Sequence, residues 1–161
     1  MQRPDYQGGS IVNLMSSLIQ ARGGRSAYPV LERLPVAELA QTTNLILLVI
    51  DGLGADWLAR HSPDGILNLA RRGTLTSVFP STTAAAITTY LTGGAPLQHG
   101  LTGWHTYFRE LGCVMTVLPG TPRYGGVSYR RAGIDPAALF GQRSVFDRIQ
   151  TVSYTHLAGD S

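Results

Sequence analysis

The sequence has no lysine and is poor in charge of either sign. Its thirteen basic residues are therefore all arginine, and charged residues make up 14% of the 161-residue chain, against about 25% in an average soluble domain. The formal net charge is only +3 and the arginines are scattered, so binding to a nucleic-acid polymer is not indicated. Apolar residues reach 43%, which argues against intrinsic disorder.

Cysteine and long apolar runs are also scarce. The single cysteine, Cys113, excludes an internal disulfide framework, and no Cys/His spacing matches a zinc ribbon or finger. No run reaches the roughly 18 apolar residues of a membrane span, and the first nine residues lack the pattern of a signal peptide. We therefore expect a cytoplasmic, one-domain protein with no membrane partner.

Predicted strands alternate with predicted helices, which is the pattern of a parallel α/β sheet. Asn44–Ile50 is an almost purely apolar run, as expected for a central strand buried on both faces. Thr74–Phe79 and Val114–Leu118 favour two further strands. The remaining periodic segments predict helices over residues 10–21, 55–61, 64–72, 81–91, 136–140 and 144–149. Residues 1–43 are expected to form a helix and a linker ahead of the sheet.

Two polar positions follow the first two predicted strands, at the edge where ligands bind in open α/β sheets. Asp51 ends the most apolar strand. Because an unpaired buried carboxylate is costly, it needs a metal, an arginine or backbone N–H groups, unless it only caps a turn. The hydroxyls of 81–83 open a predicted helix, where free N–H groups favour phosphate, although an ordinary N-cap is the alternative. Together the two positions point to phosphoryl chemistry with a metal-activated nucleophile.

A set of short motifs in Leu47–Gly103 extends this interpretation. The pieces are, in chain order, Asp51-Gly52, Pro80–Thr83, Thr92-Gly93, Pro96 and His99-Gly100. In their order and spacing they resemble the type I phosphodiesterase/nucleotide pyrophosphatase family of the alkaline phosphatase superfamily. The resemblance implies an alkaline-phosphatase-like fold, here a partial three-layer α/β/α sandwich with a mainly parallel sheet.

The resemblance also implies roles for single residues. Asp51 would bind one of two divalent metal ions, expected to be zinc, and Thr83 would be the nucleophile and a ligand of the same ion. Thr82 is the nearest rival to Thr83. His99 matches a family position, but we expect it to shape its loop rather than bind metal. Trp104 stands where well-studied members carry an asparagine that holds the phosphoryl group. Stacking of Trp104 or Tyr107 on a base is less expected than simple packing. The expected substrate is a small phosphodiester or a nucleotide.

The family's further Asp and His ligands are not found after Thr83, although two zinc ions need roughly seven or eight protein ligand atoms. We therefore expect residues 44–151 to be the N-terminal part of a catalytic domain that is inactive alone. Residues 152–161 resemble translated adapter sequence and are expected to be a non-native tail, so His156 and Asp160 are left out of the site.

Several alternatives stay open. The same scaffold could serve a phosphomonoesterase, a sulfatase-like enzyme or a phosphonate hydrolase, and the chain could be an inactive fragment that binds an anion at the Thr83 helix end. A haloacid-dehalogenase-type phosphatase is disfavoured because Leu53 stands where that family needs a second aspartate. A dinucleotide-binding fold is disfavoured because no G-x-G-x-x-G follows a strand.

Overall fold

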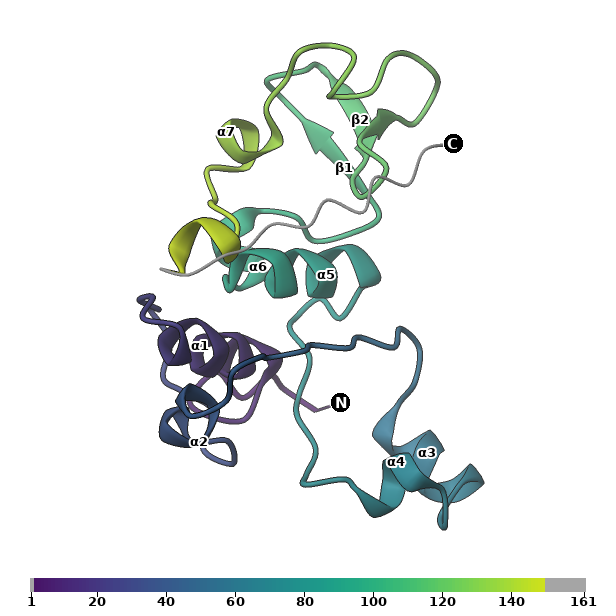
Figure 1. Ribbon diagram of the computed structural model, residues 1–161. Coiled ribbons are helices and arrows are strands. Elements are labelled where there is room, and N and C mark those ends of the chain that lie inside the picture. The colour runs from purple at the N-terminus through teal and green to yellow at the C-terminus, as the bar shows by residue number, and fades with distance from the viewer. Residues whose placement is uncertain (1, 150–161) are drawn as a thin grey trace.

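The computed structural model describes residues 2–149 and combines short helices with one small sheet (Figure 1). The helices are α1 (Ile11–Ala21), α2 (Val36–Ala40), α3 (Ala55–His61), α4 (Ile66–Leu69), α5 (Thr83–Thr92), α6 (Pro96–His99), α7 (Pro136–Phe140) and the 3-10 helix η1 (Phe146–Arg148). The strands are β1 (His105–Phe108), β2 (Cys113–Thr116) and β3 (Thr121–Pro122).

Helix α1 packs against α5 and forms the centre of the described chain. Ile11 and Val12 of α1 share a buried cluster with Val78 and with Ala85 of α5. The side chain of Asn13, which is fully buried, is satisfied because its amide donates to the carbonyls of Tyr6 and Pro29. Residues 11–21 therefore share a core with the region after residue 44, and the division of the chain at residue 43 stays a prediction.

The sheet is antiparallel, with strand order β1-β2-β3. β1 pairs with β2 through a short turn, in the register that places Phe108 opposite Cys113. One face of the sheet covers a second buried cluster, to which Ala84 of α5, Phe108, Met115 and Tyr129 belong. Helix α5 thus lies between two cores, and its fully buried Ala84 and Ala85 leave room for both.

The predicted parallel sheet is not formed by the described residues. The α/β class is confirmed, but Asn44–Ile50 runs as an unpaired extended segment, with Ile46 92% and Leu48 75% exposed. A strand that is apolar on both faces needs neighbouring strands and covering layers, and no described segment supplies them. Thr74–Phe79 makes only an isolated parallel bridge, Ser10 with Thr76. The three-layer sandwich is therefore not seen in this part of the chain.

The other secondary-structure predictions agree more closely. Helices predicted at 10–21, 55–61, 81–91 and 136–140 appear as α1, α3, α5 and α7, and the strand predicted at Val114–Leu118 appears as β2. The helix predicted at 64–72 shortens to α4, and the one at 144–149 becomes η1. The sequence did not predict α2, α6, β1 or β3. The predicted tail 152–161 lies outside the described residues.

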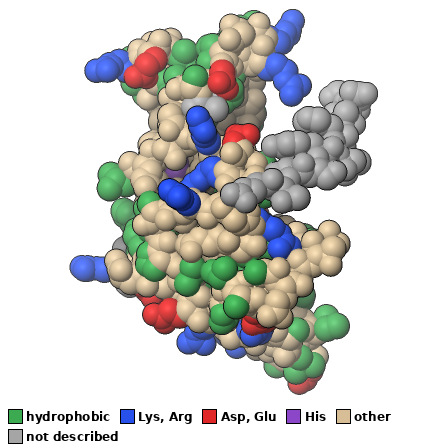
Figure 2. Space-filling view, turned by 60° about the vertical axis from the view of Figure 1, so that its left-hand side comes forward, with side chains coloured by type: hydrophobic (Ala, Val, Ile, Leu, Met, Phe, Trp, Pro, Cys, Tyr) green, Lys and Arg blue, Asp and Glu red, His purple; other side chains and the backbone are tan. Residues whose placement is uncertain are grey.

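The segment between α2 and α5 leaves the body of the molecule and carries α3 and α4 with it (Figure 1). Neither helix has a buried residue. This excursion begins with the extended segment 44–50 and returns at Thr76, where the backbone bonds to Gly9 and Ile11. Apolar side chains are correspondingly frequent on the surface, as the green areas in Figure 2 show.

Candidate active site

The two residues that the sequence pairs, Asp51 and Thr83, meet in the structure. The Thr83 hydroxyl donates a hydrogen bond to Asp51 Oδ2 at 3.2 Å, across 32 positions of sequence. Asp51 ends the extended segment 44–50, and Gly52, with φ of +77°, turns the chain into α3. Thr83 is the first residue of α5. The predicted proximity is confirmed, whereas the chemical roles of both residues stay predictions.

The neighbouring hydroxyls at the start of α5 have different partners. Thr82 is the N-cap: its Oγ1 accepts from the Ala85 N–H at 3.3 Å and donates to the Thr102 carbonyl at 3.2 Å. Its hydroxyl is therefore committed to the backbone. Among residues 2–149 the Thr83 hydroxyl has Asp51 as its only hydrogen-bond partner, and it faces a cavity. Thr82 therefore caps the helix, whereas the Thr83 hydroxyl is available to a ligand in the cavity.

This cavity, of about 410 Å³, has the size of a small-ligand site. It lies between the extended segment that ends at Asp51 and the first two turns of α5. Its lining is Val49–Gly54, Ser77, Ser81–Thr83, Ala86, Ile87 and Tyr90. Sequence reasoning did not single out Ile87 and Tyr90, although their spacing from Thr83 places them on the same helix face. Burial raises the pKa of Tyr90, so its hydroxyl stays protonated at neutral pH.

The N-terminus of α5 supplies donors as well as a hydroxyl. The backbone N–H groups of Thr83 and Ala84 make no hydrogen bond in the described part of the chain. They lie at the positive end of a ten-residue helix, where the free N–H groups and the helix dipole attract anions. An oxyanion placed beside the Thr83 hydroxyl would meet these donors.

His99 has the structural surroundings that the sequence analysis expects for it. Its side chain is buried, its Nδ1 accepts from the Leu101 N–H at 3.1 Å, and its Nε2 lies 3.5 Å from Thr89 Oγ1. Burial lowers its pKa to about 4, so the ring is neutral at pH 7. It joins the loop after α6 to α5 and does not line the cavity at Thr83.

Trp104 and Tyr107, the aromatic residues considered for stacking on a base, lie away from the candidate site. Neither lines the cavity at Thr83. Trp104 precedes β1 and its carbonyl accepts from the Val117 N–H at 2.9 Å, while Tyr107 belongs to β1 and is exposed. The structure gives no support to a contact between these rings and a substrate at Thr83.

The described residues do not complete a metal site. Asp51 and Thr83 bring two oxygen donors together, whereas zinc in proteins takes about four ligands. Within residues 2–149 no group of three or more His, Cys, Asp or Glu side chains is arranged to hold an ion. The donor chemistry at Asp51 suits a divalent cation, but the ligand set is incomplete.

A known family model matches the part of the chain that contains this site. The model for type I phosphodiesterase / nucleotide pyrophosphatase matches residues 45–134, which is more than half of the chain and includes Asp51, Thr83 and His99. The chain therefore belongs to the type I phosphodiesterase/nucleotide pyrophosphatase family. Membership of this family suggests hydrolysis of phosphodiester or pyrophosphate bonds. No curated protein and no solved structure gave a significant match.

The structure also bears on the membrane expectation. Among the described residues, no helix has both the length and the apolar character needed to span a bilayer. The cytoplasmic location stays a prediction.

Proposed function

We propose that the protein is a metal-dependent hydrolase of phosphodiester or nucleotide pyrophosphate bonds that uses Thr83 as its nucleophile. The observation that carries this proposal is the 3.2 Å hydrogen bond from the Thr83 hydroxyl to Asp51. It lies at the start of α5, inside the region that the family model matches. Small phosphodiesters and nucleotides fit the cavity of about 410 Å³ in front of these residues.

The chain's own residues would act as follows. Asp51 orients the Thr83 hydroxyl by accepting its hydrogen bond. Thr83 Oγ1 then forms a bond to phosphorus while the bond from phosphorus to the leaving oxygen breaks, which gives a phosphothreonine ester and a leaving group that takes up a proton. The N–H groups of Thr83 and Ala84 stabilise the negative phosphoryl oxygens. In a second displacement, a water oxygen forms a bond to phosphorus while the bond from phosphorus to Thr83 Oγ1 breaks. Oγ1 takes up a proton from the water and the phosphate product leaves, which restores the hydroxyl.

Metal dependence is part of the proposal. A divalent cation, proposed to be zinc, would lower the pKa of the threonine hydroxyl and offset phosphoryl charge when it is bound. Asp51 and Thr83 would be two of its ligands. Two ligand residues are too few for one zinc ion and fall further short of the number needed for two. The remaining ligands are proposed to come from outside residues 2–149.

The proposal extends to the fold around Asn44–Ile50. We propose that Asn44–Ile50 is a strand of a parallel sheet in a complete alkaline-phosphatase-like domain, of which this chain would be the N-terminal part. The support is its apolar character on both faces together with its exposure here. A complete domain would cover these side chains and would fix Asp51 at the carboxyl edge of the sheet.

The test is hydrolysis by the complete gene product with added zinc. Thr83→Ala is expected to lower kcat for a diester such as bis(4-nitrophenyl) phosphate by at least about 10³-fold. Thr83→Ser keeps a hydroxyl and is expected to retain part of the activity. Thr82→Ala, the matched neighbour, is expected to keep most of it.

Two outcomes would contradict the proposal. Full activity of a folded Thr83→Ala protein would exclude the nucleophile. A preference for 4-nitrophenyl phosphate over the diester would favour a phosphomonoesterase on the same scaffold.

A further inference from the structure

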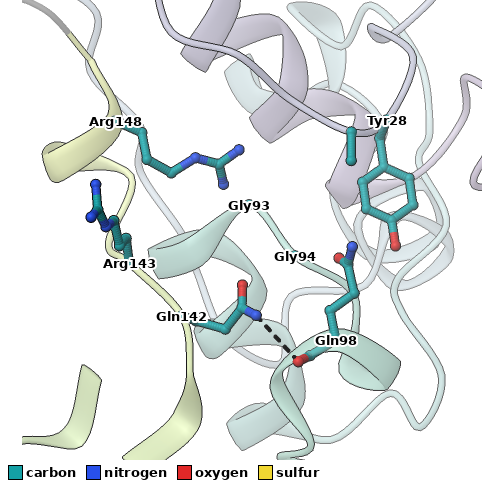
Figure 3. A pocket seen from close by; sticks show the side chains of 8 residues that line it. Tyr28, Gly93, Gly94, Gln98, Gln142, Arg143 and Arg148 are labelled. Atoms are coloured by element: carbon teal, nitrogen blue, oxygen red, sulfur yellow. Dashed lines mark hydrogen bonds between the residues drawn. The ribbon is translucent and has the colours of Figure 1, made fainter. Parts of the chain in front are cut away.

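A second cavity, of about 400 Å³, lies at the far end of α5 from Thr83 (Figure 3). It forms where the loop of Ala27 and Tyr28, the link between α5 and α6, and the segment 142–148 come together. Its lining is Ala27, Tyr28, Gly93, Gly94, Gln98, Gln142, Arg143 and Arg148. Because α5 has ten residues and a length of about 15 Å, this cavity is separate from the candidate active site.

The cavity is lined by two arginines and by no acidic side chain. The nearest acid in sequence, Asp147, is turned to Ser144, whose N–H and hydroxyl both donate to its Oδ2. Arg143 is exposed and makes no hydrogen bond or ion pair among residues 2–149. The lining therefore carries positive charge that nothing in it neutralises. Figure 2, which turns the side of α7 and η1 forward, shows arginine side chains near the middle of that face.

The guanidinium of Arg148 is held in place and still has donors to offer. One terminal nitrogen donates to the Thr92 carbonyl and the other to the Arg25 carbonyl, both at 2.6 Å. An arginine has five N–H donors, so three remain after these two bonds. A cation that is already fixed by the fold loses little entropy when it binds an anion.

Two side-chain amides complete the polar lining. Gln142 Nε2 donates to the Gln98 backbone carbonyl at 3.3 Å, the dashed line of Figure 3. Gln98 Oε1 accepts from the Ala95 N–H at 3.0 Å, which leaves the amide NH₂ of Gln98 without a protein partner in this part of the chain. In Figure 3 this side chain extends along the cavity past Gly94 toward Tyr28. Such groups recognise hydroxyls, because an amide can both donate and accept.

Glycine keeps the cavity open. A Cβ at Gly94 would lie 3.1 Å from Gln98 Oε1 and 3.5 Å from Gln142 Oε1, inside the space between the two amides. The backbone φ of Gly94 is not in the left-handed region, so an alanine there would fill the space without backbone strain, and Gln98 Oε1 would have to shift by a few tenths of an ångström.

We propose that this cavity binds a small phosphate-bearing metabolite. Arg143 and Arg148 hold the phosphate, since guanidinium groups bond phosphate oxygens in a bidentate, charge-assisted way. The amides of Gln98 and Gln142 hold hydroxyl groups on the remainder of the ligand. A volume of about 400 Å³ accommodates a molecule of the size of a sugar phosphate. The site is independent of the proposed hydrolysis at Thr83.

The test is an NMR titration of the isotope-labelled chain with three probes: ribose 5-phosphate, inorganic phosphate and ribose. Ribose 5-phosphate is expected to shift the amide signals of Gly93 and Gly94 and to saturate. Inorganic phosphate is expected to shift the same amide signals but to bind with lower affinity. Ribose is expected to cause no shifts. Shifts at Thr83 in place of Gly93 and Gly94 would assign the binding to the candidate active site and would overturn the proposal, as would the absence of binding.

Variants localise the contact. Arg143→Gln, at an exposed side chain without a protein partner, is expected to raise Kd for ribose 5-phosphate about tenfold. Arg109→Gln removes an exposed arginine outside the cavity and is the charge control, with Kd expected to stay within twofold. Gly94→Ala is expected to weaken binding with no change of charge. Equal losses in Arg143→Gln and Arg109→Gln would show non-specific attraction and overturn the proposal, whereas Thr83→Ala is expected to leave this Kd unchanged.

Discussion

At the scale of single residues, the difference between Thr82 and Thr83 is a difference of hydrogen-bond partners. Both are threonines at the start of one helix, and the sequence offers both as nucleophiles. The Thr82 hydroxyl serves as donor and acceptor to the backbone, while the Thr83 hydroxyl reaches Asp51. The motif already favoured Thr83, and the geometry adds the physical reason, because a capping hydroxyl cannot leave its partners without a cost to the helix.

His99 gives a residue-scale prediction about pH. Its folded pKa of about 4 lies below the value of roughly 6.5 expected for the unfolded chain. The unfolded state therefore binds more protons between these values, and the contribution of His99 to stability, present above about pH 6.5, is lost as pH falls toward 4. The expected loss is up to about 3 kcal/mol, measured as the free energy of unfolding in urea at several pH values.

A matched pair of variants isolates this contribution. His99→Asn keeps an acceptor near the position of Nδ1 for the Leu101 N–H and removes the titration, so its unfolding free energy is expected to vary less between pH 6.5 and 4 than that of the wild type. The exposed His61 is the control, and His61→Asn is expected to follow the wild-type profile. Identical profiles for His99→Asn and the wild type would contradict the assignment.

At the scale of elements, helix α5 connects the candidate active site to both buried clusters. Its N-terminus presents Thr83, its middle contributes Ala84 and Ala85 to two cores, and its C-terminus ends at Gly93, whose φ of +70° suits glycine. Sequence reasoning found this helix from its alanines and its cap. It did not find α6 or β1, because neither of these four-residue segments shows a clear periodicity of apolar residues.

The N-cap of α5 gives an element-scale prediction. Thr82→Ala removes the bonds to the Ala85 N–H and the Thr102 carbonyl, and is expected to lower the free energy of unfolding by about 1 kcal/mol. Ser81→Ala, one residue earlier, removes an exposed hydroxyl that makes no hydrogen bond within the described part of the chain, and it is expected to change the free energy of unfolding by less than about 0.5 kcal/mol. Denaturant unfolding of both variants decides the point, and equal values would show that Thr82 does not cap the helix.

At the scale of the whole molecule, the exposed segment Asn44–Ile50 is the main difference between the described structure and the expected α/β/α sandwich. The sequence predicts a buried strand, and the structure shows the same residues extended and uncovered. The prediction was wrong for the described residues because burial requires partners from elsewhere, which a pattern of apolar residues cannot supply by itself.

This leads to a prediction that distinguishes the 161-residue chain from the longer gene product that we propose. Ile46→Thr, at a side chain that is 92% exposed, is expected to change the free energy of unfolding of the 161-residue chain by less than about 0.5 kcal/mol. In the complete product it is expected to cost about 1–3 kcal/mol, because the side chain would be covered there.

Val78→Thr provides the comparison. Val78 is 2% exposed in the described core, so its substitution is expected to destabilise both proteins by about 1–3 kcal/mol. A large loss for Ile46→Thr in the 161-residue chain would mean that the segment is already packed there. An equally small effect in both proteins would contradict the proposed central strand.

What the sequence determined by itself is local. The caps and alanines of α5, the apolar run before Asp51 and the order of the motifs follow from neighbouring residues, and they suffice to predict the family and the pairing of Asp51 with Thr83. Only the tertiary structure decided which hydroxyl is committed to the backbone, that the sheet of the described chain is antiparallel, and that Arg143 and Arg148 line one cavity with Gln98 and Gly94. These features depend on contacts between residues far apart in sequence, and no local pattern encodes such contacts.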